Sequence, residues 1–234
     1  MELYYTTDIT KENAVLSEDE SIHCIRILRH KVGDEIYFTD GLGGFYKSKI
    51  TNAHPKRCEL AIIHKKEKEK RDYHLHIAIA PTKSIDRTEF FVEKAVEIGI
   101  DEITFLKCER SERKDVKIER IKKIALSAMK QSKKAFLPVI NPTVSFKEFI
   151  QQHNISEKYI ACLDETHQKG LVDISKKEKE YLILIGPEGD FSPTEVKSAI
   201  GEGFKSLSLG ENILRTETAA IFACMYINTF RQIS

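Results

Sequence analysis

No apolar run in this 234-residue sequence approaches the roughly 20 residues that a membrane-spanning helix needs. The N-terminal residues, MELYYTTDIT, also lack the basic and then apolar segments of a secretory signal. Both absences argue against a membrane or secreted protein. We therefore expect the protein to stay in the cytoplasm, with no membrane partner.

Metal-binding patterns are missing as well. The five cysteines are scattered and none forms a CxxC pair, so we expect neither a zinc site nor a disulfide framework. We predict that the cysteines are small buried apolar side chains and that the protein needs no metal. The net charge of +1 argues against indiscriminate coating of nucleic acid, although local basic patches could still engage RNA.

Two phosphate-binding signatures are also absent. No GxxxxGK[ST] Walker loop occurs in the sequence. A dinucleotide fingerprint is missing too, because Gly201 and Gly203 lie at a predicted helix end and not after a strand. A nicotinamide oxidoreductase is therefore disfavoured.

Residues 1 to about 70 are predicted to be β-rich. Turn residues separate candidate strands at Leu3–Thr6, Glu35–Thr39, Gly44–Thr51 and Arg57–His64. One short helix with Ile22, Ile25 and Leu28 on one face interrupts them. The charged run at residues 65–72 predicts a domain linker, with a solvated strand extension as the alternative.

From residue 73 onward, strands alternate with helices. The predicted strands are His74–Ala80, Glu102–Leu106, Tyr159–Leu163, Tyr181–Ile185 and Ser206–Leu209. The predicted helices are 84–98, Lys117–Gln131, Phe146–Gln152, Pro193–Glu202 and Thr216–Arg231. This alternation indicates an α/β domain with a mainly parallel sheet and helices on its faces.

The strongest local signal is YLILIGPEGDFSPTEV at residues 181–196. An apolar strand ends in a glycine loop, Gly186 to Gly189, whose glycines let a ligand approach the backbone. A helix then begins with Ser192 as its cap, followed by proline and, three residues after the cap, Glu195. The loop therefore lies at the carboxyl end of a strand, where open α/β sheets bind ligands.

The segment SLSLGENILRTETAA at residues 206–220 repeats this layout. A strand ends at Gly210, and Thr216 can cap the final helix. Each loop alone could be an ordinary strand–helix turn, but two such loops in one chain favour a shared pocket. Neither loop carries a lysine or a clear phosphate nest, so a nucleoside without phosphates fits by exclusion. S-adenosylmethionine meets that description.

Together, IGPEGDFSPTEV and LGENILRTETAA resemble the C-terminal signature of the 16S ribosomal RNA uracil-N3 methyltransferase family, within the SPOUT class of knotted methyltransferases. Further stretches agree in the right order, at residues 23–34, 83–100, 108–114 and 128–140. Two positions depart from the family pattern: Asp190 stands where many relatives carry glycine, and Lys134 where many carry arginine.

The resemblance implies a PUA-like β-barrel for RNA binding at residues 1–70 and a SPOUT α/β domain with a trefoil knot at residues 71–234. It implies S-adenosylmethionine as cofactor and a homodimer whose pockets are completed near the partner. The implied reaction is methylation of N3 of a uridine in 16S ribosomal RNA within the assembled small subunit.

Carried over residue by residue, the resemblance implies a cofactor cradle of Leu163, Ile185, Gly186, Pro187, Glu188, Gly189, Leu209, Gly210, Leu214 and Thr218. Because N3 of uracil carries a proton that must leave, Glu217 is the candidate base, with complementing the positive N-terminal end of the helix dipole as its alternative role. Arg215 is the candidate group that stabilises charge on the uracil oxygens, with cofactor or phosphate binding as its alternative.

Basic residues are expected to supply the RNA surface. The N-terminal basic cluster consists of Arg26, Arg29 and Lys31. A second predicted set consists of Lys83, Arg87, Lys94, Arg110, Arg113, Lys133 and Lys134. Two other functions stay open at this point: a SPOUT enzyme acting on a ribose 2′-hydroxyl or another base, and a non-catalytic ribosome-assembly factor that binds RNA but no cofactor.

Overall fold

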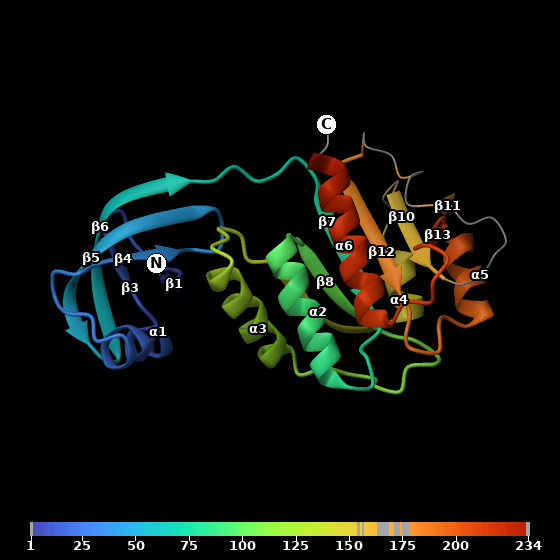
Figure 1. The fold of residues 1–234 in the computed structure, drawn as a ribbon, viewed down its shortest axis with the longest axis horizontal. Coiled ribbons are helices and arrows are strands. Elements are labelled where there is room, and N and C mark those ends of the chain that lie inside the picture. The colour runs from blue at the N-terminus through green and yellow to red at the C-terminus, as the bar shows by residue number, and fades with distance from the viewer. Residues whose placement is uncertain are drawn as a thin grey trace. The chain divides into compact units, whose positions relative to one another are not determined.

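The computed structural model describes residues 2–153, 155, 157–162, 169–170, 174 and 178–232. The chain divides into two compact units (Figure 1). The first comprises Met1–Lys70 together with Leu126–Leu137, and the second comprises Arg71–Ala125 and Pro138–Ser234. The grouping of 126–137 with the N-terminal residues is not expected from the sequence. Among the described residues, no helix is long and apolar enough to span a bilayer.

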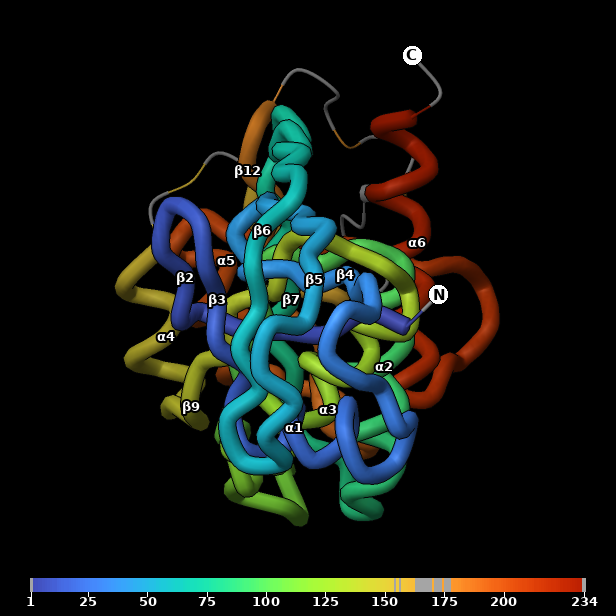
Figure 2. The backbone as a smooth tube through the Cα atoms, turned by 90° about the vertical axis from the view of Figure 1, so that its left-hand side faces the viewer, coloured from blue at the N-terminus to red at the C-terminus, as the bar shows by residue number. Residues whose placement is uncertain are grey.

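The first unit contains a six-stranded sheet in the order β1-β4-β5-β6-β3-β2. Strand β1 runs parallel to β4, and the other described pairs are antiparallel. Figure 2 shows the two longest strands, β5 and β6, side by side. The strands are β1 (Leu3–Tyr5), β2 (Asp8–Ile9), β3 (Asn13–Val15), β4 (Glu35–Thr39), β5 (Gly44–His54) and β6 (Arg57–Glu67). The four predicted strands are confirmed, and β2 and β3 are additional.

The charged run after residue 64 begins as strand and not as linker. Strand β6 continues to Glu67, which pairs with Gly44 of β5. The extension is stable although it is hydrophilic, because the ladder satisfies its backbone groups and its lysines project into water. Lys65 also lies 5.6 Å from the centre of the Tyr46 ring. The linker prediction is therefore wrong for residues 65–67, where the alternative of a strand extension holds.

The predicted short helix is present, and it changes from α-helix to π-helix along its length. Helix α1 (Glu18–Ile22) begins at Ser17, whose side chain accepts a hydrogen bond from the amide of Glu20. It continues directly into the π-helix η1 (His23–Ile27). The core of this unit packs the sheet against these helices through Tyr4, Ala14, Leu16, Cys24, Ile36, Phe38, Tyr46, Ile50, Cys58 and Leu60.

The second unit is built on a seven-stranded sheet in the order β11-β13-β10-β12-β7-β8-β9. Every described pair is parallel, which confirms the predicted sheet type. The strands are β7 (His74–Ile79), β8 (Glu102–Lys107), β9 (Val139–Ser145), β10 (Glu157–Ala161), β11 (Lys169–Gly170), β12 (Glu180–Ile185) and β13 (Lys205–Ser208). Strands β9 and β11 are additional to those predicted.

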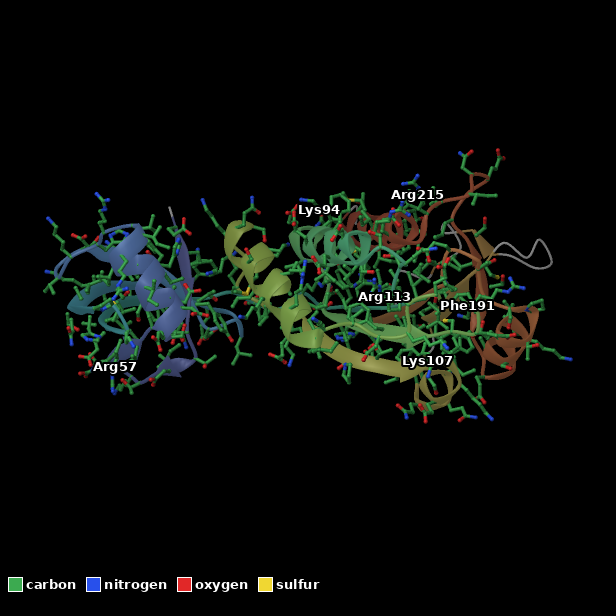
Figure 3. All side chains as sticks on the ribbon, turned by 90° about the horizontal axis from the view of Figure 1, so that it is seen from below. Arg57, Lys94, Lys107, Arg113, Phe191 and Arg215 are labelled. Atoms are coloured by element: carbon green, nitrogen blue, oxygen red, sulfur yellow. The ribbon has the colours of Figure 1, made fainter. Side chains whose placement is uncertain are left out.

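Helices cover both faces of this sheet. Helices α2 and α6 lie side by side over one face, and α4 and α5 lie over the other (Figures 1 and 3). The predicted helices are confirmed as α2 (Ile85–Ile98), α3 (Ile118–Gln131), α4 (Phe146–Gln152), α5 (Pro193–Gly201) and α6 (Thr216–Gln232). The apolar strand β12 is buried because its Leu182 and Leu184 pack with Phe149 and Phe204 in the α4–α5 layer.

Candidate functional site

A cavity of about 420 Å³ lies where strands β10, β12 and β13 end. Since these strands are parallel neighbours, their carboxyl ends meet at one edge of the sheet. The lining residues come from these strand ends, the loops that follow them and the start of α6: Ala161, Cys162, Ile185, Gly186, Pro187, Glu188, Asp190, Ser208, Leu209, Gly210, Glu211, Ile213, Leu214, Thr216 and Ala219. Its volume falls in the range of small-molecule sites.

Most of the predicted cofactor cradle is gathered around this cavity: Ile185, Gly186, Pro187, Glu188, Leu209, Gly210 and Leu214 line it. Gly189 and Thr218 are not among the lining residues, and Leu163 lies outside the described residues. The predicted cradle lacks eight lining residues: Ala161, Cys162, Asp190, Ser208, Glu211, Ile213, Thr216 and Ala219. The first two were missed because β10 ends without a glycine signature.

The first glycine loop is a tight turn. The amide of Asp190 donates to the carbonyl oxygen of Pro187 at 2.9 Å. Asp190 itself has φ of 60°, a left-handed conformation that favours glycine. At Gly186 a Cβ atom would lie only 3.1 Å from the Phe191 ring. The absence of a side chain at Gly186 therefore keeps this loop close to its own core.

The helix after this loop begins as the sequence predicts. Ser192 and Glu195 form a complete capping box, with proline at the start of α5. The second carboxylate oxygen of Glu195 accepts a hydrogen bond from the amide of Glu109 at 2.8 Å. The cap thus also connects α5 to the loop after β8. Burial raises the pKa of Cys108 in that loop, and Glu195 adds to the rise, so this thiol is a poor nucleophile.

The second glycine loop depends on backbone conformation. Gly210 has φ of +115°, a backbone conformation that residues other than glycine rarely adopt. A Cβ atom at this position would meet no atom within 4 Å. Its amide donates to the Ser208 hydroxyl at 3.3 Å. The loop shape therefore comes from torsion angles and not from tight packing.

The candidate catalytic residues stand beside the cavity but do not line it. Arg215 is exposed at the start of α6 (Figure 3). Glu217 is buried, and its Oε1 lies 3.9 Å from Nε of Arg87 on α2. Its Oε2 is buried and has no hydrogen-bond partner within the part of the chain that the structure describes.

The predicted RNA-binding residues separate into bonded and unbonded groups. Arg110 donates to the carbonyl of Gly189 at 2.8 Å, and Arg113 donates to the carbonyls of Thr82 and Lys83. The side chains of Lys83 and Lys94 form ion pairs with Glu112 and with Glu93 and Glu97. These four cations therefore each have a partner within the protein, although Lys83 and Arg110 are exposed.

By contrast, the N-terminal basic cluster is exposed and forms no ion pair among the residues described here. Arg29 also has φ of 58°, so the chain turns sharply there. Lys133 is exposed with φ of 53°, and Lys134 is half-buried. Among the predicted RNA-binding residues, the exposed cations without a described ion pair or side-chain hydrogen bond therefore lie in the first unit. No group of three or more metal-ligating side chains that could hold a metal occurs in the described ranges.

Comparison with known proteins agrees with this geometry. Residues 68–228 match the model of an RNA methyltransferase domain, and residues 16–63 match that of an RNA methyltransferase PUA domain. A probable rRNA-methyltransferase from Porphyromonas gingivalis is 42% identical, with a TM-score of 0.91 over 100% of this chain and 99% of that one.

Two further relatives carry a more specific name. The ribosomal RNA small subunit methyltransferase E of Mesomycoplasma hyopneumoniae is 36% identical over 63% of this chain and 65% of that protein. The crystal structure of the enzyme of that name from Neisseria gonorrhoeae, bound to S-adenosyl methionine, is 25% identical, with a TM-score of 0.87 over 98% of both chains. The family resemblance seen in the sequence is confirmed: this chain belongs to the RNA methyltransferase family that combines an RNA methyltransferase domain with a PUA domain.

Proposed function

We propose that this protein transfers a methyl group from S-adenosylmethionine to N3 of a uridine in the 16S RNA of the small ribosomal subunit. The names of its relatives support the class of reaction, and the gonococcal relative supports the cofactor. The observation that carries the proposal is the cavity at the sheet edge, to which both glycine loops contribute.

The chemistry of the cavity wall fits this cofactor. Its charged side chains are all acidic: Glu188, Asp190 and Glu211. The described lining residues include no lysine or arginine, which disfavours phosphate groups and suits a ligand that carries a sulfonium and an ammonium. Ile185, Leu209 and Leu214 supply apolar surface for an adenine ring. When bound, S-adenosylmethionine supplies a methyl group already activated by the sulfonium.

The main task of the protein is then to align the uracil with that methyl group, a form of catalysis that can contribute several kcal/mol. We propose that Glu217 accepts the N3 proton and that Arg215 stabilises the charge that develops on O2 or O4. Both residues belong to the first turn of α6 or precede it directly, beside the lining residues Leu214 and Thr216.

We assign the first contact with RNA to the N-terminal basic cluster. Its three cations are exposed and have no competing internal ion pair within the described residues, so they are available to phosphates. Phosphate contacts orient the RNA without specifying its sequence. The uridine itself must therefore be selected elsewhere, at the cavity end of the second unit.

We also propose a homodimer through the face formed by α2 and α6. This face exposes Phe90, Phe222 and Met225, which are 50%, 42% and 50% accessible. Large apolar side chains gathered on two adjacent helices are typical of a surface that another protein covers. The trefoil knot, the assembled small subunit as substrate and a cytoplasmic location belong to the same proposal.

The decisive experiment is mass spectrometry of ribosomal RNA. Purified protein is incubated with S-adenosylmethionine and small ribosomal subunits from cells that lack it, with naked 16S RNA in parallel. We expect one new methyl group on N3 of one uridine, and more product with the subunits. Methylation at a ribose 2′-hydroxyl or on another base would contradict the proposed reaction, and an absence of methylation in both substrates would contradict an enzymatic role.

A further inference from the structure

Three loops meet at the carboxyl edge of the second unit's sheet. They follow the adjacent strands β12, β7 and β8, and they comprise residues 186–191, 80–84 and 108–113. Only the first of them contributes to the cavity wall. The shape of that wall nevertheless depends on how the other two loops hold it.

Arg113 holds the loop after β7 by its backbone. Its Nε donates to the carbonyl oxygens of Thr82 at 3.1 Å and of Lys83 at 3.2 Å. Its Nη2 donates to the carbonyl oxygen of Lys83 at 2.9 Å. A planar guanidinium suits this grip because it presents several donors in fixed directions, which a lysine ammonium cannot reproduce.

The same segment is held from its amide side by the glycine loop. The amide of Lys83 donates to Oε1 of Glu188 at 2.8 Å, and Glu188 lines the cavity. Arg110, three residues before Arg113, donates to the carbonyl of Gly189 at 2.8 Å. Arg113 is thereby connected to the cavity wall through one peptide segment, without reaching the wall itself.

We propose that Arg113 is a positioning residue for the cofactor. It fixes the Lys83 amide, which in turn fixes Glu188 and the glycine loop in the shape that binds S-adenosylmethionine. This inference rests on the proposed function, and it replaces direct RNA contact as the role of Arg113. Its bonds to two carbonyls occupy the Nε–Nη2 edge of the guanidinium, which is one of the edges that could bind a phosphate.

The test compares three variants of the full chain: Arg113→Ala, Arg113→Lys and Lys114→Ala. Lys114 is the matched control, since it is an exposed neighbouring cation that forms no ion pair among the described residues. Calorimetry without RNA measures the Kd for S-adenosylhomocysteine. We expect Arg113→Ala to raise it about threefold to tenfold, the scale of one partly exposed charge-assisted hydrogen bond. Arg113→Lys should give a smaller rise, and Lys114→Ala none.

Kinetics and coupling give further readouts. At saturating cofactor, Arg113→Ala should keep the wild-type kcat and the wild-type KM for RNA, while the KM for cofactor rises. Combining it with Glu188→Ala, which removes the acceptor of the Lys83 amide, should raise the Kd by less than the product of the two single effects, because both act on the same segment. If the two substitutions change the free energy of cofactor binding additively, the connection through Lys83 is overturned. This comparison remains valid if Arg113→Ala lowers the melting temperature.

Two results separate this inference from the proposed function. A wild-type protein that binds no S-adenosylhomocysteine refutes the proposed function, and this inference with it. A wild-type protein that binds it, together with an Arg113→Ala variant of unchanged Kd and raised KM for RNA, refutes this inference alone and restores Arg113 as an RNA contact.

Discussion

The conformation of Gly210 allows a substitution whose effect is almost purely a matter of backbone torsion. At φ of +115° an alanine is strained, yet its Cβ atom would meet nothing within 4 Å. Gly210→Ala therefore adds no clash. The strain of a residue other than glycine in such a region is on the order of 1–3 kcal/mol.

The loop can respond in two ways. If it keeps its shape, the free energy of unfolding falls by the strain, and the melting temperature falls by roughly 2–4 °C per kcal/mol. If it relaxes, the cavity wall loses its binding shape, and cofactor binding must restore it. In that case the strain of about 1–3 kcal/mol raises the Kd for cofactor about fivefold to 150-fold. Since Gly210 lines the cavity and its loop is loosely packed, we expect relaxation to dominate.

The assay is calorimetry with S-adenosylhomocysteine, paired with thermal melting. Gly201→Ala is the matched control, because its Cβ atom would also meet nothing within 4 Å and its φ is not in the strained range. Gly201 is the last residue of α5, where alanine is favourable by up to about 1 kcal/mol, so its Kd should stay at the wild-type value. The reasoning is refuted if Gly210→Ala has a Kd within twofold of the wild-type value and an unchanged melting temperature.

Four further outcomes are expected. Glu217→Gln should lower turnover by about 10²-fold or more with unchanged cofactor Kd, and near-normal turnover would exclude it as the base. Replacing the N-terminal basic cluster by alanine should reduce the slope of log affinity for RNA against log salt by about 2 to 3, whereas an unchanged slope would remove it from the RNA surface. Phe222→Glu should convert the dimer to monomer in light scattering; a wild-type mass would contradict the α2–α6 interface. Burial, with help from His153 and His74, lowers the pKa of His76 to about 3, so between about pH 6.5 and 3 the unfolded chain binds a proton that the folded chain does not. The free energy of unfolding should therefore fall by roughly 4 kcal/mol as the pH drops through this range. In acid titrations followed by circular dichroism, His76→Gln should flatten this fall.

Local signals explain why so much of the second unit is predictable. The apolar run of β12, the capping box at Ser192 and the alternation of strands and helices are each set by a few neighbouring residues. Such short-range patterns are sufficient to place both glycine loops at strand ends. Strands β9 and β11 carry weaker patterns, because β9 contains asparagine and proline and β11 has only two residues, so the sequence does not reveal them.

By itself, the sequence determined the type of sheet, because periodicity, caps and glycines act over short stretches of chain. The family and seven of the fifteen residues that line the cavity followed from the resemblance to known methyltransferases. Only the tertiary structure decided which of the predicted RNA-binding cations bond within the protein. Arg110 and Arg113 look like surface cations in the sequence, yet backbone carbonyls from distant loops occupy them, whereas Arg26 and Arg29 stay unpaired within the described chain. The physical reason is that hydrogen bonds between loops form only after separate strands have aligned their ends, and no local pattern records which ends will meet.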